Sequence, residues 1–317
     1  MGIVKGGRSI SPVDDPSLEI FMRYAIPNTQ IHTPVLCVHG ATIASALFDA
    51  DGESLLDDLA SLGIPAYALD IRGYARSLPP SDAPDNRPYA RATEAVLDVD
   101  AAVRTIMKEH PSRTVSLVGM SWGTIISSVY ATGIGKGLIE RLVLIAPICD
   151  HVDTKELERL MGGMDEGQIP AFRFVSKETF VERLQQEHPT IAEDEWLLRG
   201  VLDDVFKNSL QNQQTGKIQV PNGCLVDLIS AFKGKGFYNP ANISVPTLIA
   251  RGTKDPTSSR PGALSIYDRL GGAATYLEVS GAAHFGLIEK NGSQIRNGIC
   301  SFLKQLRPNQ NQTASRP

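Results

Sequence analysis

The sequence has 317 residues, of which 42% are hydrophobic, 21% charged and 6% aromatic, so it is long enough to bury a large core. Its formal net charge is −4 and it has no basic stripe, which argues against nucleic acid or an anionic membrane as the main partner. It has no signal-peptide pattern and no run of 18 apolar residues, so we expect a soluble, cytoplasmic protein with one main domain and an insertion.

Short apolar runs alternate with helical patterns along the chain, which is typical of a parallel sheet covered by helices. An alternating segment at 18–25 predicts an antiparallel edge strand ahead of them. Buried strands are expected at 34–40, 64–73, 114–120, 141–147, 245–252 and 274–281. Helices are expected at 51–61, at 93–110 and after residue 284. The predicted fold class is therefore α/β, with a mostly parallel sheet flanked by helices.

The pattern changes between residues 150 and 240. Charged helical segments occur there without a convincing buried strand, which predicts an inserted α-helical cap over 151–239. The core would then consist of residues 1–150 together with 240–306. The last residues, 307–317, are polar and include prolines, so we expect a disordered tail.

The segment Gly119-Met120-Ser121-Trp122-Gly123 lies where a predicted strand meets a predicted helix. A side chain at the apex of such a turn has strained backbone angles, and glycines two places away on each side relieve the crowding. Ser121 would project from this turn as a nucleophile. The helix would direct its free N–H groups at the same point, and the N–H of Trp122 could bind an oxyanion.

Two other strand ends carry residues suited to activating a serine. Asp255 follows the strand that ends at 252, and His284 follows the strand that ends near 281. Because ligands bind beyond the carboxyl ends of parallel strands, we expect Ser121, Asp255 and His284 to meet at one edge of the sheet. Asp150, after the strand at 141–147, is the alternative acid.

The segments "GMSWG" (119–123), "RGTKD" (251–255) and "GAAHF" (281–285) resemble the nucleophile, acid and histidine loops of the α/β-hydrolase family. The resemblance covers roughly residues 15–150 and 240–305. The segment "HGATIAS" is similar to the family loop that supplies a second oxyanion N–H, which would be that of Ala41, with Thr42 nearby. The resemblance implies a serine hydrolase of a small-molecule ester or lactone. The four cysteines are widely scattered and the histidines lack metal-ligand spacing, so we expect no metal, and no other cofactor is predicted. A homodimer is possible.

Other residues allow more than one interpretation. His39 precedes the oxyanion-loop glycine and is expected to brace that loop, and His151 and His188 are expected at the surface. The cap aromatics could line an apolar substrate pocket or form the core of the cap. The aromatic residues considered for the pocket are Phe172, Phe174, Phe180 and Trp196.

The same machinery could serve amide hydrolysis, carbon–carbon cleavage or acyl transfer, and a non-catalytic ligand receptor is a more distant alternative. Carbon–carbon hydrolases of the family usually have a glycine-rich loop where this chain has "HGATIA". A receptor would not require the serine, aspartate and histidine together. Hydrolysis of epoxides is disfavoured because those relatives place an aspartate at the position of Ser121.

Overall fold

The computed structural model describes residues 2–81, 83, 86–163, 165–211 and 214–305, so the predicted tail at 307–317 lies outside the described residues. The main domain contains an eight-stranded sheet with the order β1-β2-β4-β3-β5-β6-β9-β10. The strands from β4 to β10 in this order are parallel, whereas β2 pairs antiparallel with both β1 and β4. The strands span Ile3–Ile10 (β1), Ile20–Pro27 (β2), Val35–Val38 (β3), Ala66–Leu69 (β4), Val115–Met120 (β5), Ile139–Ile145 (β6), Thr247–Gly252 (β9) and Ala274–Val279 (β10).

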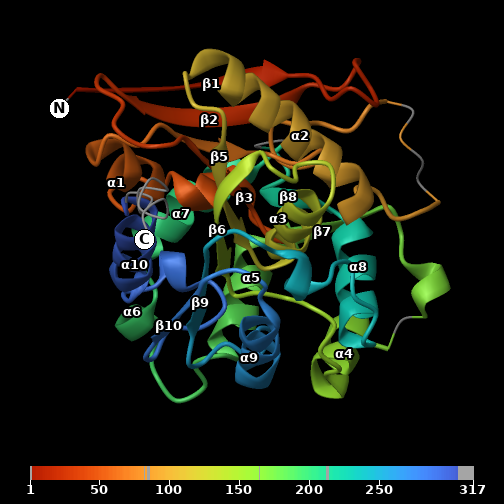
Figure 1. The fold of residues 1–317 in the computed structure, drawn as a ribbon. Helices are drawn as coiled ribbons and strands as arrows, with labels where there is room; N and C mark the ends of the chain where they lie inside the picture. The colour runs from red at the N-terminus through yellow and green to blue at the C-terminus, as the bar shows by residue number, and fades with distance from the viewer. Residues whose placement is uncertain (1, 82, 84–85, 164, 212–213, 306–317) are drawn as a thin grey trace.

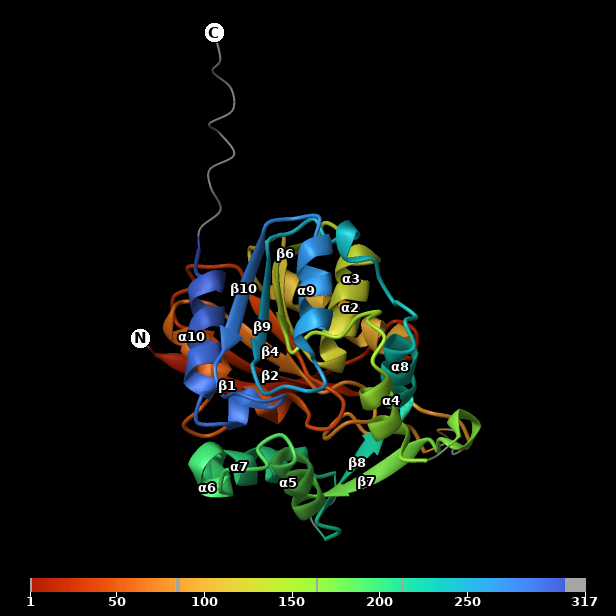
Figure 2. The same cartoon turned by 90° about the horizontal axis from the view of Figure 1, so that it is seen from below.

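Helices cover both faces of this sheet, as Figures 1 and 2 show. One face carries α1 (Leu55–Ser61) and α10 (Gly292–Leu303), and the other carries α2 (Ala92–Glu109), α3 (Trp122–Thr132) and α9 (Arg260–Arg269). Short 3-10 helices lie at Ser45–Phe48 (η1), Glu166–Gln168 (η2), Pro240–Asn242 (η3) and Gly286–Ile288 (η4). The prediction of a mostly parallel sheet flanked by helices is confirmed.

The segment at 18–25 is antiparallel as predicted, but its expected position at the sheet edge is wrong. Strand β1 lies outside it and pairs with β2 from Ile3↔Pro27 to Ile10↔Ile20. Sequence reasoning missed β1 because most of its side chains are exposed or half-exposed and it contains two adjacent glycines. Those glycines allow the aromatic rings of β2 to lie against the strand, since a Cβ on Gly7 would stand 2.2 Å from the Phe21 ring.

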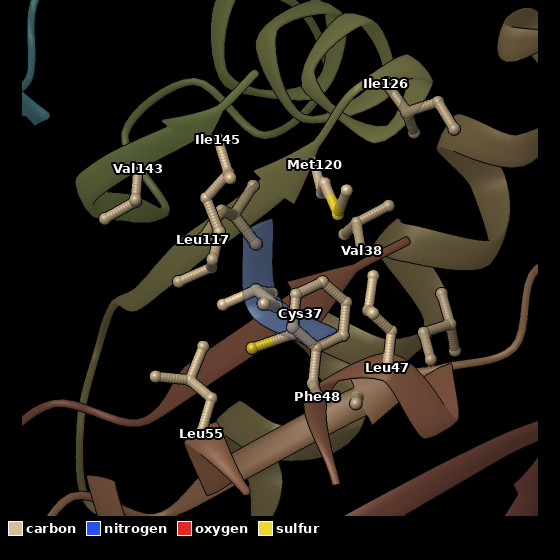
Figure 3. Close-up of a cluster of buried hydrophobic side chains, with 14 of the residues drawn as sticks. Cys37, Val38, Leu47, Phe48, Leu55, Leu117, Met120, Ile126, Val143 and Ile145 are labelled. Carbon is tan, nitrogen blue, oxygen red and sulfur yellow. The ribbon is translucent and has the colours of Figure 1, made fainter. Parts of the chain in front are cut away.

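The main core is built from the central strands and the helices on either side of them. Figure 3 shows side chains of β3, β5 and β6 packed against residues of η1, α1 and α3. The labelled members are Cys37, Val38, Leu47, Phe48, Leu55, Leu117, Met120, Ile126, Val143 and Ile145. All of them are at most 3% exposed. Burial of each large aliphatic side chain contributes about 1.5–3 kcal/mol, so this cluster holds the strand ends in fixed positions.

The inserted segment between β6 and β9 lies along one side of the main domain (Figure 2). Its helices are α4 (Thr154–Met161), α5 (Lys177–Gln185), α6 (Glu193–Trp196), α7 (Arg199–Ser209) and α8 (Gly223–Phe232). It also contains an antiparallel pair of strands that the sequence did not predict, β7 (Phe172–Ser176) and β8 (Lys217–Pro221). We call residues 151–239 the cap.

Local signals set several helix ends. Ser54 caps α1 by accepting a hydrogen bond from the Asp57 N–H, and Asp153 caps α4 through the Glu156 N–H. Gly162 ends α4 in the left-handed conformation. Within the described part of the chain, no helix has the length and apolar character needed to cross a membrane.

Candidate active site

Three side chains from three strand ends form one hydrogen-bonded chain. Ser121 follows β5, Asp255 follows β9 and His284 follows β10, so all three lie beyond the carboxyl edge of the parallel strands. His284 Nε2 lies 2.9 Å from Ser121 Oγ. His284 Nδ1 lies 3.0 Å from each carboxylate oxygen of Asp255. All three side chains belong to buried residues, with exposures of 3–4%.

The turn that carries Ser121 has the strained geometry that its glycines predict. Ser121 has φ 52° and ψ −120°, which a residue with a Cβ adopts only when the surrounding structure holds it there. The glycines make that close packing possible: a Cβ on Gly119 would stand 2.6 Å from the Gly123 carbonyl oxygen, and one on Gly123 would stand 2.3 Å from the Val38 carbonyl oxygen. The strand and helix therefore meet at a distance that only glycine allows.

The electrostatics of the pair favour a charged carboxylate beside a basic imidazole. Although burial opposes the shift, the His284 contact holds the pKa of Asp255 below its ordinary value. The Ser258 N–H also donates to Asp255 Oδ1 at 2.9 Å. Burial lowers the pKa of His284, but the Asp255 carboxylate outweighs it and raises that pKa above the ordinary value. A neutral His284 can then hold its Nδ1 proton toward Asp255 and present its Nε2 lone pair to Ser121.

Two glutamates, one half-buried and one buried, hold the backbone of the loop that carries His284. Glu187 of the cap accepts a hydrogen bond from the His284 N–H at 2.9 Å, and Glu289 accepts one from the Ala283 N–H at 3.0 Å. Sequence reasoning missed both residues, because neither lies in a recognisable motif. The loop position therefore depends on the cap as well as on the main domain.

The two backbone N–H groups predicted to bind an oxyanion are placed near the serine. Trp122 is the first residue of α3, so its N–H has no partner in the helix ladder. Ala41 lines the same cavity as Ser121. A Cβ on the neighbouring Gly40 would lie 3.1 Å from Ser121 Cβ, so the two loops are in close contact. Within the described residues, neither N–H donates to another protein group.

The Trp122 side chain does not enter the cavity. Its indole is fully buried and donates to Asp227 Oδ2 at 3.0 Å. Asp227 belongs to α8 of the cap and also accepts from Arg91 Nε and from the Ala92 N–H, at 2.5 and 2.6 Å. This carboxylate therefore ties the cap to the start of α2 and to the residue after the serine.

His39 braces the neighbouring loop, as the sequence suggested. Its Nε2 accepts the Ile71 N–H at 3.1 Å and its Nδ1 lies 2.7 Å from the Gly40 carbonyl oxygen. These contacts require the neutral ring with the proton on Nδ1, and burial lowers the pKa of His39 in agreement with that form. His39 therefore has no free nitrogen for proton transfer.

The cavity around Ser121 is small, with a volume of about 40 Å³. Thr42 lines it, as do Leu160, Leu225 and Leu228 from the cap. Three arginines of the cap also line it, and no sequence motif had indicated them. They are Arg159, Arg173 and Arg183.

The cap aromatics considered for the pocket lie elsewhere, which corrects that interpretation. Phe172 and Phe174 line a separate surface depression with Pro79 and Pro80, and Phe174 is 64% exposed. Trp196 is buried in the cap. None of these three rings belongs to the described wall of the Ser121 cavity. Strand β7 directs Phe172 and Phe174 to its opposite side, and α6 packs Trp196 into the cap core.

Asp150, the alternative acid, pairs with an arginine and not with His284. Asp150 forms an ion pair with Arg269, at 2.5 Å from Nη2 to Oδ1, and this contact holds the pKa of Asp150 at about 2. His151 is half-exposed and does not line the cavity. His188 is buried, not at the surface as expected, because its ring stacks on Trp196 at 4.4 Å between centroids.

Comparisons with known proteins agree with this architecture. The model of a protein family described as "alpha/beta hydrolase fold" matches residues 33–291. An esterase from Exiguobacterium antarcticum is 16% identical with a TM-score of 0.67, and the match covers 95% of this chain and 100% of that one. A bromoperoxidase from Bacillus anthracis is 15% identical with a TM-score of 0.63, at 95% and 100% coverage. A serine hydrolase from Cycloclasticus zankles is 17% identical with a TM-score of 0.61, at 95% and 98% coverage. At these identities the structural likeness shows the fold.

Proposed function

The chain belongs to the alpha/beta hydrolase fold family, and from this premise we propose that it is a serine hydrolase acting on a carboxylic ester or lactone of a small organic molecule. The observation that carries the proposal is the continuous chain from Ser121 Oγ through His284 to Asp255, with heavy-atom distances of 2.9 and 3.0 Å. A binding protein has no need for this arrangement, whereas acyl transfer to a serine requires each member of it.

Acylation begins when Ser121 Oγ attacks the substrate carbonyl carbon. His284 Nε2 accepts the hydroxyl proton as the new carbon–oxygen bond forms, and Asp255 stabilises the resulting imidazolium. The tetrahedral intermediate then expels the alcohol oxygen, which takes the proton back from Nε2. The products of this half-reaction are the alcohol and an ester between the substrate acyl group and Ser121.

Deacylation repeats the proton transfers with water. His284 takes a proton from a water molecule that attacks the acyl carbon, and then returns it to Ser121 Oγ as the carboxylic acid leaves. In both halves the N–H groups of Trp122 and Ala41 would hold the negative oxygen. Loss of one such donor typically reduces the rate by about 10²–10³-fold. The N-terminus of α3 adds a favourable partial positive charge.

A fluorophosphonate probe tests the nucleophile directly, because it labels only an activated serine. We expect labelling of the intact protein, with the added mass located on Ser121 by peptide mass spectrometry. Ser121→Ala should abolish both labelling and hydrolysis of p-nitrophenyl esters.

Ser127→Ala is the matched control, because Ser127 lies in α3, the helix that begins directly after Ser121, and its buried hydroxyl has no hydrogen-bond partner among the described residues. This variant should keep labelling and turnover. Label on another residue, or turnover of more than a few per cent by folded Ser121→Ala, would remove Ser121 from its proposed role.

A further inference from the structure

The cap places positive charge on the wall of the Ser121 cavity. Arg159 from α4, Arg173 from β7 and Arg183 from α5 all line it, together with Ser121 and His284 of the main domain. The described residues of its wall include no aspartate or glutamate. A cavity with three cations on its wall favours a negatively charged occupant.

Of the three arginines, Arg159 gives the least support for an anion-binding site. Its Nε lies 2.6 Å from Glu156 Oε2, and its side chain is one-third exposed. Thr257 Oγ1 donates to the same carboxylate at 2.6 Å. Arg159 is therefore largely neutralised by a partner within the protein.

Arg173 has only neutral acceptors. Its Nη1 donates to Asn222 Oδ1 at 2.7 Å and its Nη2 donates to the Ala41 carbonyl oxygen at 2.9 Å. None of the described carboxylates lies within 4.0 Å of its nitrogens. These contacts fix the guanidinium beside the loop that carries the Ala41 N–H and leave its positive charge uncompensated by a direct ion pair.

The Arg183 side chain has no hydrogen bond and no ion pair among the described residues. Its Nε is buried without a hydrogen-bond acceptor, and its guanidinium lies over the Phe285 ring at 5.6 Å from the centroid. Burial lowers the pKa of Arg183, and the neighbouring Arg159 lowers it further. A cation in this position is costly unless an anion accompanies it. Glu187 attracts it, but the Glu187 carboxylate already accepts the His284 N–H.

We propose that the substrate is an ester bearing a carboxylate, and that Arg173 and Arg183 bind this carboxylate while the ester carbonyl lies at Ser121. The inference rests on the proposed function for the reaction, although the anion site itself does not depend on turnover. Arginine suits the task because its planar guanidinium can donate two parallel hydrogen bonds to a carboxylate.

Matched substrate pairs test this specificity. Mono-p-nitrophenyl adipate is compared with its methyl ester, and 4-acetoxybenzoate with methyl 4-acetoxybenzoate, after subtraction of the rates without enzyme. The first pair places the carboxylate on the acyl side and the second on the alcohol side. We expect the ratio of kcat/KM for the charged ester to that for its neutral partner to exceed one in at least one pair.

Replacement of the unpaired arginine shows whether that ratio depends on it. Arg183→Met keeps much of the length of the side chain without its charge, and it should lower the ratio by about 10–100-fold, the usual size of a hydrogen-bonded charge contact. Arg199→Met is the matched control, because Arg199 is also a cap arginine but is exposed and paired with Glu193 outside the cavity. The ratio should stay the same in this control.

Calorimetric binding of adipate separates this inference from the proposed function. We expect adipate to bind the unmodified protein and the Ser121→Ala variant, and to bind Arg183→Met at least 10-fold more weakly. If Ser121-dependent turnover occurs but neutral esters are preferred in both pairs, the carboxylate inference fails and the hydrolase stands. If no ester is hydrolysed but adipate binding depends on Arg183, the anion site stands and the hydrolase fails.

Discussion

The Glu187 carboxylate of the cap accepts a hydrogen bond from the backbone N–H of His284 at 2.9 Å. The contact joins the segment after α5 to the residue whose ring lies between Ser121 and Asp255. It also acts on the ring electrostatically, because the negative charge of Glu187 raises the pKa of His284 in addition to the larger effect of Asp255. The cap therefore influences the proposed base without entering the hydrogen-bonded chain.

Glu187→Gln should shift the acidic limb of the pH profile to lower pH. The base must be neutral to accept a proton, so kcat/KM falls as the pH drops through the pKa of His284. Glutamine can still accept the His284 N–H through its amide oxygen, but it lacks the charge that raises this pKa. The measurement is kcat/KM for a neutral p-nitrophenyl ester between pH 5 and 9.

Glu182→Gln is the control for this experiment, since Glu182 is an exposed residue of α5, the helix that precedes Glu187. Its acidic limb should coincide with that of the unmodified protein. An unchanged limb in Glu187→Gln, or a shift toward higher pH, would show that Glu187 does not tune the base through its charge.

Asp255→Asn should reduce kcat by about 10⁴-fold, because an amide in place of the carboxylate favours the wrong imidazole tautomer and no longer stabilises the imidazolium. Asp150→Asn should reduce kcat less than about threefold, since Asp150 contacts Arg269 and not His284. Steady-state kinetics of the two variants, with circular dichroism to verify folding, decides between the two carboxylates. The opposite ranking would identify Asp150 as the acid.

Gly123→Ala should destabilise the protein strongly. The added methyl group would stand 2.3 Å from the Val38 carbonyl oxygen and 2.5 Å from that of His39, and backbone atoms cannot move aside cheaply. We expect a loss of about 1–3 kcal/mol or more in the free energy of unfolding. Gly200→Ala is the control, because a Cβ at Gly200 has no atom within 4 Å and alanine favours helix α7. Equal urea midpoints for the two variants would contradict the close packing of the turn.

The central strands were predictable because each is a short apolar run, buried on both faces and followed by a turn. The run at 115–120, for example, is buried throughout and leads directly to Ser121. The order of Ser121, Asp255 and His284 along the chain placed all three at one sheet edge, because parallel strands share that edge. These strands and the three site residues were therefore predictable from local sequence patterns.

The cap was less predictable because its structure depends on partners far away in the chain. The segment "FRFVS" pairs with residues 217–221, and this pairing directs Phe174 to the surface while Arg173 reaches the Ala41 carbonyl oxygen. The three cavity arginines lie on separate elements, and each resembles an ordinary charged surface residue when viewed alone. Only the tertiary structure brings them to one wall.

Glu289→Gln should change how the stability of the protein depends on pH. Glu289 is 1% exposed, its Oε2 accepts the Ala283 N–H, and its Oε1 has no partner among the described residues. Burial raises the pKa of Glu289 to about 8, from an ordinary value of 4.5. The folded protein therefore binds this proton more tightly than the unfolded chain does, so the contribution of Glu289 to stability is present below about pH 4.5 and is lost as the pH rises toward 8.

Glutamine stays neutral throughout this range and can accept the Ala283 N–H through its amide oxygen. The Tm of the variant should therefore rise relative to that of the unmodified protein as the pH increases from about 5 to about 8, the interval over which the unfolded chain has released this proton and the folded protein still holds it. Differential scanning calorimetry at half-unit pH steps measures the difference, and Glu182→Gln serves again as an exposed control whose Tm should follow that of the unmodified protein. A Tm difference that stays constant with pH would mean that Glu289 titrates alike in the folded and unfolded chains, and that the histidine loop is held by an ordinary carboxylate.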